Sequence, residues 1–81
     1  MKISAELSLY PLNENFGTPI LEFIQKLKQH PELEIRTNTM STQVFGDFDV
    51  LTKILNSELK TVFETDETVI IVMKIVNKDL R

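Results

Sequence analysis

Polar side chains that could bind a small molecule occur in two segments of the 81-residue chain. In the first segment Glu6 is flanked by Ser4 and Ser8 and followed by Tyr10, and the second segment covers residues 38–45. A carboxylate can bind a cation or an amino group, hydroxyls and amides donate and accept hydrogen bonds, and aromatic rings stack on flat ligands. The candidate ligand-binding residues are Glu6, Ser8, Tyr10, Asn38, Met40, Ser41, Thr42, Gln43 and Phe45.

The chain shows no catalytic signature. His30, the one histidine, precedes Pro31 and is interpreted as the end of a helix, where a cation interacts favourably with the helix dipole. Ser41 and Thr42 would need an adjacent general base to act as nucleophiles, and the sequence offers none beside them. With no cysteine and one histidine, the chain has no pattern for a metal site. We therefore expect a non-enzymatic protein without catalytic residues, metal or cofactor.

Composition excludes several classes of partner. The net charge is −3 and the basic residues are scattered, so no basic face is available to neutralise the phosphates of nucleic acid. The opening residues lack the apolar stretch of a signal peptide, and the longest apolar run, residues 69–73, is too short to cross a bilayer. The expectation is a small cytoplasmic domain with no nucleic-acid or membrane partner.

Four segments have the pattern of β-strands. Residues 2–10 alternate between apolar and polar side chains, which predicts a strand with one buried face and places Glu6 on the other face. In the third strand Val44 is expected to face the core, with Gln43 and Phe45 opposite. The predicted strands are residues 2–10, 33–39, 42–45 and 68–76.

Two segments have the 3.6-residue apolar period of helices. The first begins at Thr18-Pro19, a cap followed by a proline at the first helical position, and ends before Pro31. The second follows Gly46, which allows a tight exit from the strand, and is capped by Asp47. Its predicted buried stripe is Phe48, Leu51, Ile54, Leu55, Leu59 and Val62. Loops are expected at residues 13–17 and 65–67.

These elements predict one α+β domain covering residues 1–81. The order βαββαβ, with right-handed crossovers, is typical of the ferredoxin-like plait. Its four-stranded antiparallel sheet has the strand order 4-1-3-2 and two helices on one face. Strands one and three would be central, so Glu6 and Gln43 would lie on the face that the helices leave open.

The last strand predicts self-association. Residues 68–76 are apolar on both faces, and an edge strand of this kind invites pairing with another chain. We therefore expect a homodimer or homotetramer formed through the open sheet face and this strand. If that face is covered, Glu6 needs a counterpart. It could be Arg36 or Lys74, or a ligand with amino groups or a positive charge.

The opening strand ending in Ser8-Leu9-Tyr10-Pro11-Leu12 and the segment Met40-Ser41-Thr42, Val44, Gly46-Asp47 resemble the thiamine-binding YkoF-like family, in its single-repeat branch. Helix spacing and chain length agree as well. The resemblance implies ferredoxin-like repeats that stack into dimers or tetramers, and a site for thiamine or its hydroxymethylpyrimidine part. The alternative is a structural or regulatory oligomerising domain with a protein partner and no small-molecule ligand.

Overall fold

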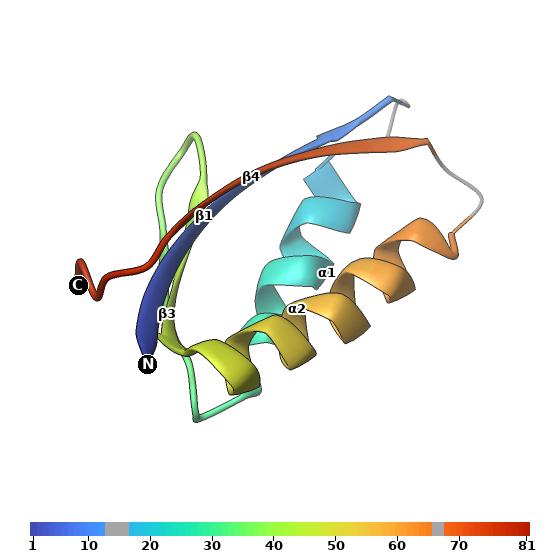
Figure 1. Cartoon of the computed structure of the whole chain (residues 1–81). Helices are drawn as coiled ribbons and strands as arrows, with labels where there is room; N and C mark the ends of the chain where they lie inside the picture. The colour runs from blue at the N-terminus through green and yellow to red at the C-terminus, as the bar shows by residue number, and fades with distance from the viewer. Residues whose placement is uncertain (13–16, 66–67) are drawn as a thin grey trace.

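The computed structural model describes residues 1–12, 17–65 and 68–81. The predicted order of elements is confirmed, and Figure 1 shows a curved sheet with both helices on one side. The elements are β1 (Lys2–Pro11), α1 (Gly17–Lys28), β2 (Glu34–Thr37), β3 (Thr42–Asp47), α2 (Phe48–Phe63) and β4 (Val69–Val76). Of the predicted loops at 13–17 and 65–67, residues 13–16 and 66–67 lie outside the described residues. In the part of the chain that is described, neither helix is long and apolar enough to cross a membrane.

The sheet has the predicted order, β2-β3-β1-β4, and every neighbouring pair is antiparallel. Central strand β1 pairs Ala5 with Val44 of β3 on one side and with Ile75 of β4 on the other. Directly paired residues share a face of the sheet. The register therefore determines which side chains of the three strands meet.

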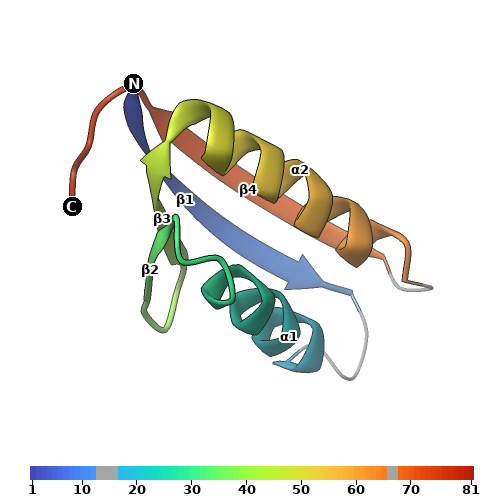
Figure 2. The same ribbon diagram turned by 90° about the horizontal axis from the view of Figure 1, so that it is seen from below.

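The core lies between the sheet and the two helices, which Figure 2 shows lying across one face of the sheet. The odd-numbered residues of β1 face it, because alternate side chains of a strand point to opposite faces. Their burial against the helices is the main favourable term in folding. The largest fully buried side chains are Phe23, Ile3, Leu7, Leu27, Leu51 and Val44.

The predicted buried stripe of α2 is wrong at one residue, Phe48. Phe48 is 41% exposed, whereas Leu51, Ile54, Leu55 and Val62 are buried. Phe48 is the first helical residue, and its N–H donates to the Met1 carbonyl at 2.8 Å, at the end of the sheet where β1 has not yet begun. The core does not extend that far.

Strands β2 and β3 each end at a residue other than the predicted one. The Asn38 side chain accepts hydrogen bonds from the N–H groups of Met40 (2.8 Å) and Ser41 (2.9 Å), so β2 ends at Thr37 and a tight turn follows. Strand β3 continues through Gly46 to Asp47, whereas the sequence predicts that this strand ends at Phe45. A Cβ on Gly46 would lie 2.8 Å from Leu33 Cδ2, so glycine permits close packing there.

Helix α2 begins as predicted. The Asp47 carboxylate caps it by accepting a hydrogen bond from the Asp49 N–H at 3.2 Å. Helix α1 begins at Gly17, one residue before the predicted cap, and ends at Lys28 as its proline signal indicates.

Candidate functional site

Glu6 lies at the centre of the open face, meaning the sheet face without helices. Its neighbours across the two adjacent strands are Gln43 of β3 and Lys74 of β4. Lys74 Nζ is 3.0 Å from Glu6 Oε1, and the Ser41 hydroxyl donates to Glu6 Oε2 at 3.0 Å. Glu6 and Gln43 share the open face as predicted, and Lys74 is the one of the two predicted counterparts that reaches Glu6.

The Glu6 carboxylate is ionised at neutral pH. Hydrogen bonds from Lys74, and next from Ser41, hold the pKa of Glu6 below its ordinary value, and the positive charge of Lys74 acts in the same direction. The Lys74 side chain is 77% exposed, so this ion pair lies in water and contributes little to stability. Another cation can therefore take the place of Lys74.

Arg36, the other predicted counterpart of Glu6, lies elsewhere. It is opposite Gln43 on strand β2, two strands from Glu6, and forms an ion pair with Glu34. Its guanidinium also lies 5.2 Å from the centre of the Phe45 ring. Because β3 lies between β2 and β1, Arg36 does not contact Glu6, and its guanidinium lies over the Phe45 ring instead.

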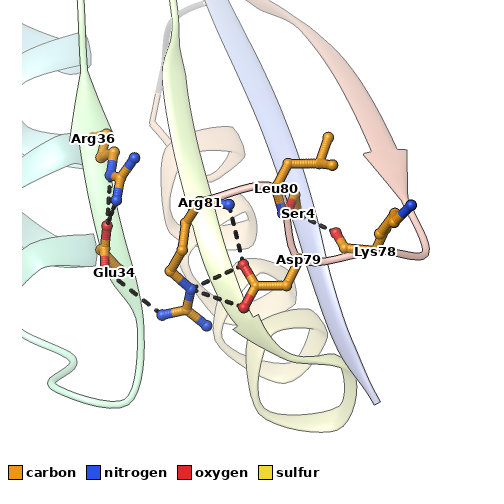
Figure 3. A network of polar contacts seen from close by, with 7 residues as sticks. All are labelled: Ser4, Glu34, Arg36, Lys78, Asp79, Leu80 and Arg81. Atoms are coloured by element: carbon orange, nitrogen blue, oxygen red, sulfur yellow. Dashed lines mark hydrogen bonds and ion pairs between the residues drawn. The ribbon is translucent and has the colours of Figure 1, made fainter.

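Residues 77–81 cross one end of the open face, as Figure 3 shows. The Ser4 hydroxyl donates to the Lys78 carbonyl at 2.8 Å and accepts from the Leu80 N–H at 2.8 Å. Arg81 lies over the Phe45 ring at 5.9 Å, is bound to Asp79 at 3.0 Å, and approaches Glu34 at 3.7 Å. This end of the face is therefore closed.

Phe45 is consequently only 4% exposed, although it lies on the open face as predicted. The prediction of Phe45 as a free stacking surface is wrong, because the two arginines already cover its ring. Sequence reasoning missed the segment 77–81, since it has no apolar period. A polar segment after a strand gives no signal of where it docks.

Replacing Ser4 by alanine is expected to release residues 77–81. Both hydrogen bonds that join this segment to β1 use the Ser4 hydroxyl, and each such bond contributes about 0.5–1.5 kcal/mol. Hydrogen exchange of the Leu80 amide should accelerate about tenfold. Ser8→Ala is the matched control on the same strand, because its hydroxyl binds Met40 instead. Equal acceleration in both variants would contradict the assignment.

The nine predicted site residues are divided between two hollows. The first, which we name the Glu6 hollow, has a volume of about 290 Å³ and includes Glu6, Gln43 and Phe45. The second, which we name the Thr42 hollow, has a volume of about 320 Å³. It includes Ser8, Tyr10, Asn38, Met40, Ser41 and Thr42. Ser41 links the two, since it borders the Thr42 hollow and donates to Glu6.

The separation follows from the pleat of β3. Thr42 pairs with the buried Leu7 and is itself only 4% exposed, so it lies on the helix side of the sheet, away from Glu6. The predicted site groups Thr42 with Glu6, whereas the structure places the two side chains on opposite faces of the sheet. Asn38 is occupied by the turn that it organises, while Met40 and Tyr10 are exposed. Among the described residues, no group of three or more histidines, aspartates or glutamates could hold a metal ion.

No family model and no curated protein matches the sequence. Several solved structures are similar, among them the following three. A structural-genomics target from Streptococcus pneumoniae is 28% identical, with 99% of this chain and 90% of that chain covered and a TM-score of 0.85. A Thermotoga maritima protein described as a candidate thiamine biosynthesis/salvage protein is 15% identical, with coverage of 96% and 85% and a TM-score of 0.84. A Bacillus cereus domain of unknown function, DUF77, is 17% identical, with coverage of 99% and 79% and a TM-score of 0.78.

These likenesses establish the ferredoxin-like fold of the chain. The thiamine-related and DUF77 structures are consistent with the fold of the YkoF-like family that the sequence resembles.

Proposed function

We propose that this protein is a non-enzymatic small-molecule-binding protein whose ligand is thiamine or its hydroxymethylpyrimidine part, bound in the Glu6 hollow. The observation that supports this most directly is an ionised carboxylate in a concave site, with the Ser41 hydroxyl and the Gln43 amide beside it. A ligand site typically contains a small number of polar groups that converge in a hollow. The likeness to a thiamine-related structure adds support.

The ligand would bind by replacing Lys74. Thiamine has a permanent positive charge and an aminopyrimidine ring, and Glu6 can accept a hydrogen bond from the amino group or pair with the charge. Lys74 loses little when it is displaced, because its ammonium is well exposed to water. Hydroxymethylpyrimidine would use the amino group alone, so thiamine should bind more tightly.

The diphosphate form of the vitamin fits less well. Two phosphates need several cationic donors, preferably bidentate arginines. Arg36 is engaged by Glu34 and Phe45, and Arg81 is engaged by Asp79. We expect the unphosphorylated ligands to be preferred.

Calorimetric titration with thiamine and with hydroxymethylpyrimidine tests the proposal. Glu6→Gln keeps the shape of the side chain and removes its charge, so it should weaken thiamine binding at least tenfold, as expected for a hydrogen bond to a charged group worth about 1.5–3 kcal/mol. Glu22→Gln makes the same change on an exposed residue of α1, on the other side of the sheet, and should leave affinity unchanged. Absence of binding, or wild-type affinity in Glu6→Gln, would refute the proposal.

We also propose that the protein self-associates through β4 and the open face. On β4, Ile70, Val72 and Val76 project from the open face, and all three are exposed. Met73 and Ile75, on the helix side, are exposed too, and β4 is an edge of the sheet. An exposed apolar edge strand is typical of a surface that another chain covers.

The same strand supports the alternative function, a structural or regulatory oligomerising domain with a protein partner and no small ligand. If the oligomer forms but neither thiamine nor hydroxymethylpyrimidine binds, this alternative becomes the better interpretation of the exposed β4.

A further inference from the structure

The Thr42 hollow lies where β1 continues beyond its partner strand. Strand β3 begins at Thr42, opposite Leu7, whereas β1 extends to Pro11. Figure 2 shows β1 continuing past β3 alongside α1. The hollow is bordered by this part of β1, by Ile20 and Ile24 of α1, and by the turn at residues 38–41. Within the described residues, the last part of β1 therefore has no paired strand on the side of β3.

The backbone groups of Leu9 point toward this unpaired side. In an antiparallel sheet, the N–H and C=O of successive residues point alternately to the two neighbouring strands. The Leu12 N–H donates to Thr68 on the β4 side, and the Met1 carbonyl accepts from Phe48 on the β3 side. Even-numbered residues of β1 thus bond toward β4 and odd-numbered residues toward β3.

The residue that would continue the ladder opposite Leu9 is Met40, and its backbone groups are already engaged. The Met40 N–H donates to the Asn38 side chain at 2.8 Å, and its carbonyl accepts from the Ser8 hydroxyl at 3.2 Å. Within the described residues, neither the N–H nor the C=O of Leu9 has a hydrogen-bond partner on this side. A donor and an acceptor of one residue are thus available at the hollow.

The Thr42 hydroxyl is a third available group. Thr42 borders the hollow and is almost completely buried, and its hydroxyl forms no hydrogen bond with any residue in the ranges described. In those same ranges no enclosed side-chain oxygen or nitrogen lacks a partner. The hydroxyl is therefore accessible from the hollow.

The hollow carries no charge on any described residue that borders it. Its walls are the side chains of leucines, isoleucines, a methionine and a tyrosine, and its polar groups are hydroxyls, an amide and the backbone. A charged ligand would lose its hydration there without a counterion, at a large cost in free energy. A neutral ligand is favoured, in contrast to the Glu6 hollow.

We propose that the Thr42 hollow binds a small neutral molecule with an amide-like edge, in which a hydrogen-bond donor lies next to an acceptor. That edge would pair with the N–H and C=O of Leu9, as a neighbouring strand does, and Thr42 would supply a third hydrogen bond. The apolar part of the ligand would contact Ile20 and Ile24. A volume near 300 Å³ is at the lower end for ligand sites and suits a single substituted ring. This second site does not depend on thiamine binding at Glu6.

Titration of the ¹⁵N-labelled protein with benzamide, followed by NMR, tests the proposal. Benzamide carries the required edge on one ring, and the Leu9 amide should shift saturably. Thr42→Val should weaken binding about three- to tenfold, as loss of one neutral hydrogen bond implies. Thr61→Val, whose hydroxyl binds Ser57 within α2, is the matched control and should bind like wild type.

Benzoate has the same ring but is charged and has no donor, so it should bind at least tenfold more weakly than benzamide. Should Thr42→Val fail to fold, the Leu9 shift and this comparison still decide the question. No shift at Leu9, equal binding of benzoate, or an unchanged affinity in a folded Thr42→Val variant would overturn the proposal. A defect at this site would leave thiamine binding at Glu6 intact, so the two proposals can fail separately.

Discussion

Replacing Val72 by lysine is expected to convert the self-associated protein into a monomer. Val72 is 51% exposed near the middle of β4 and faces the open side, opposite Ser8. A lysine there would be buried without a counterion in the proposed interface, and an unpaired buried charge costs about 3 kcal/mol or more. The dissociation constant should rise at least about a hundredfold. Sedimentation velocity at micromolar concentration measures the change.

Leu21→Lys is the matched control for this experiment. Leu21 is exposed on α1, on the other side of the sheet, and its replacement adds the same charge. It should leave the oligomer intact. A wild-type protein that sediments as a monomer would refute the proposed self-association, and equal dissociation in both variants would show that β4 is not the interface.

Replacing Leu51 by alanine is expected to cause the largest loss of stability. The Leu51 side chain is 0% exposed in the core between α2 and the sheet. Leu→Ala substitutions in such positions cost about 2–5 kcal/mol, because transfer free energy is lost and a cavity remains. A domain of this size has a free energy of unfolding of about 4–12 kcal/mol, at about 0.05–0.15 kcal/mol per residue. Urea denaturation would therefore show a large shift in midpoint.

The Phe48→Ala variant tests whether Phe48 is exposed, as in the structure, or buried, as the apolar period predicts. The apolar period assigns Phe48 and Leu51 to the same buried stripe, but the structure leaves Phe48 exposed at the end of the sheet. Its replacement should cost about 1 kcal/mol or less, because partly exposed side chains lose little burial. A loss as large as that of Leu51→Ala would mean that α2 buries a different face.

The candidate site was predictable where it depends on one strand and its direct neighbours. Alternation along β1 places Glu6 on the open face, and the strand order of the plait makes β1 central, which brings Gln43 and Lys74 to its sides. The predicted strand order, which the structure confirms, places β4 and not β2 beside β1 and so favours Lys74 over Arg36. The division into two hollows required the register between β1 and β3, which pairs Thr42 with Leu7.

What the sequence by itself determined is the set of elements and their order, because periods of two and 3.6 residues, caps and prolines are local properties of the chain. The tertiary structure alone decided three things. Residues 77–81 dock on Ser4 and close the end of the open face at Phe45, a contact between opposite ends of the chain. The register pairs Thr42 with Leu7, and β1 extends beyond β3, so that Leu9 pairs with β4 but has no strand partner on its other side within the described residues. Each depends on contacts between residues distant in the sequence, and a local pattern contains no information about such contacts.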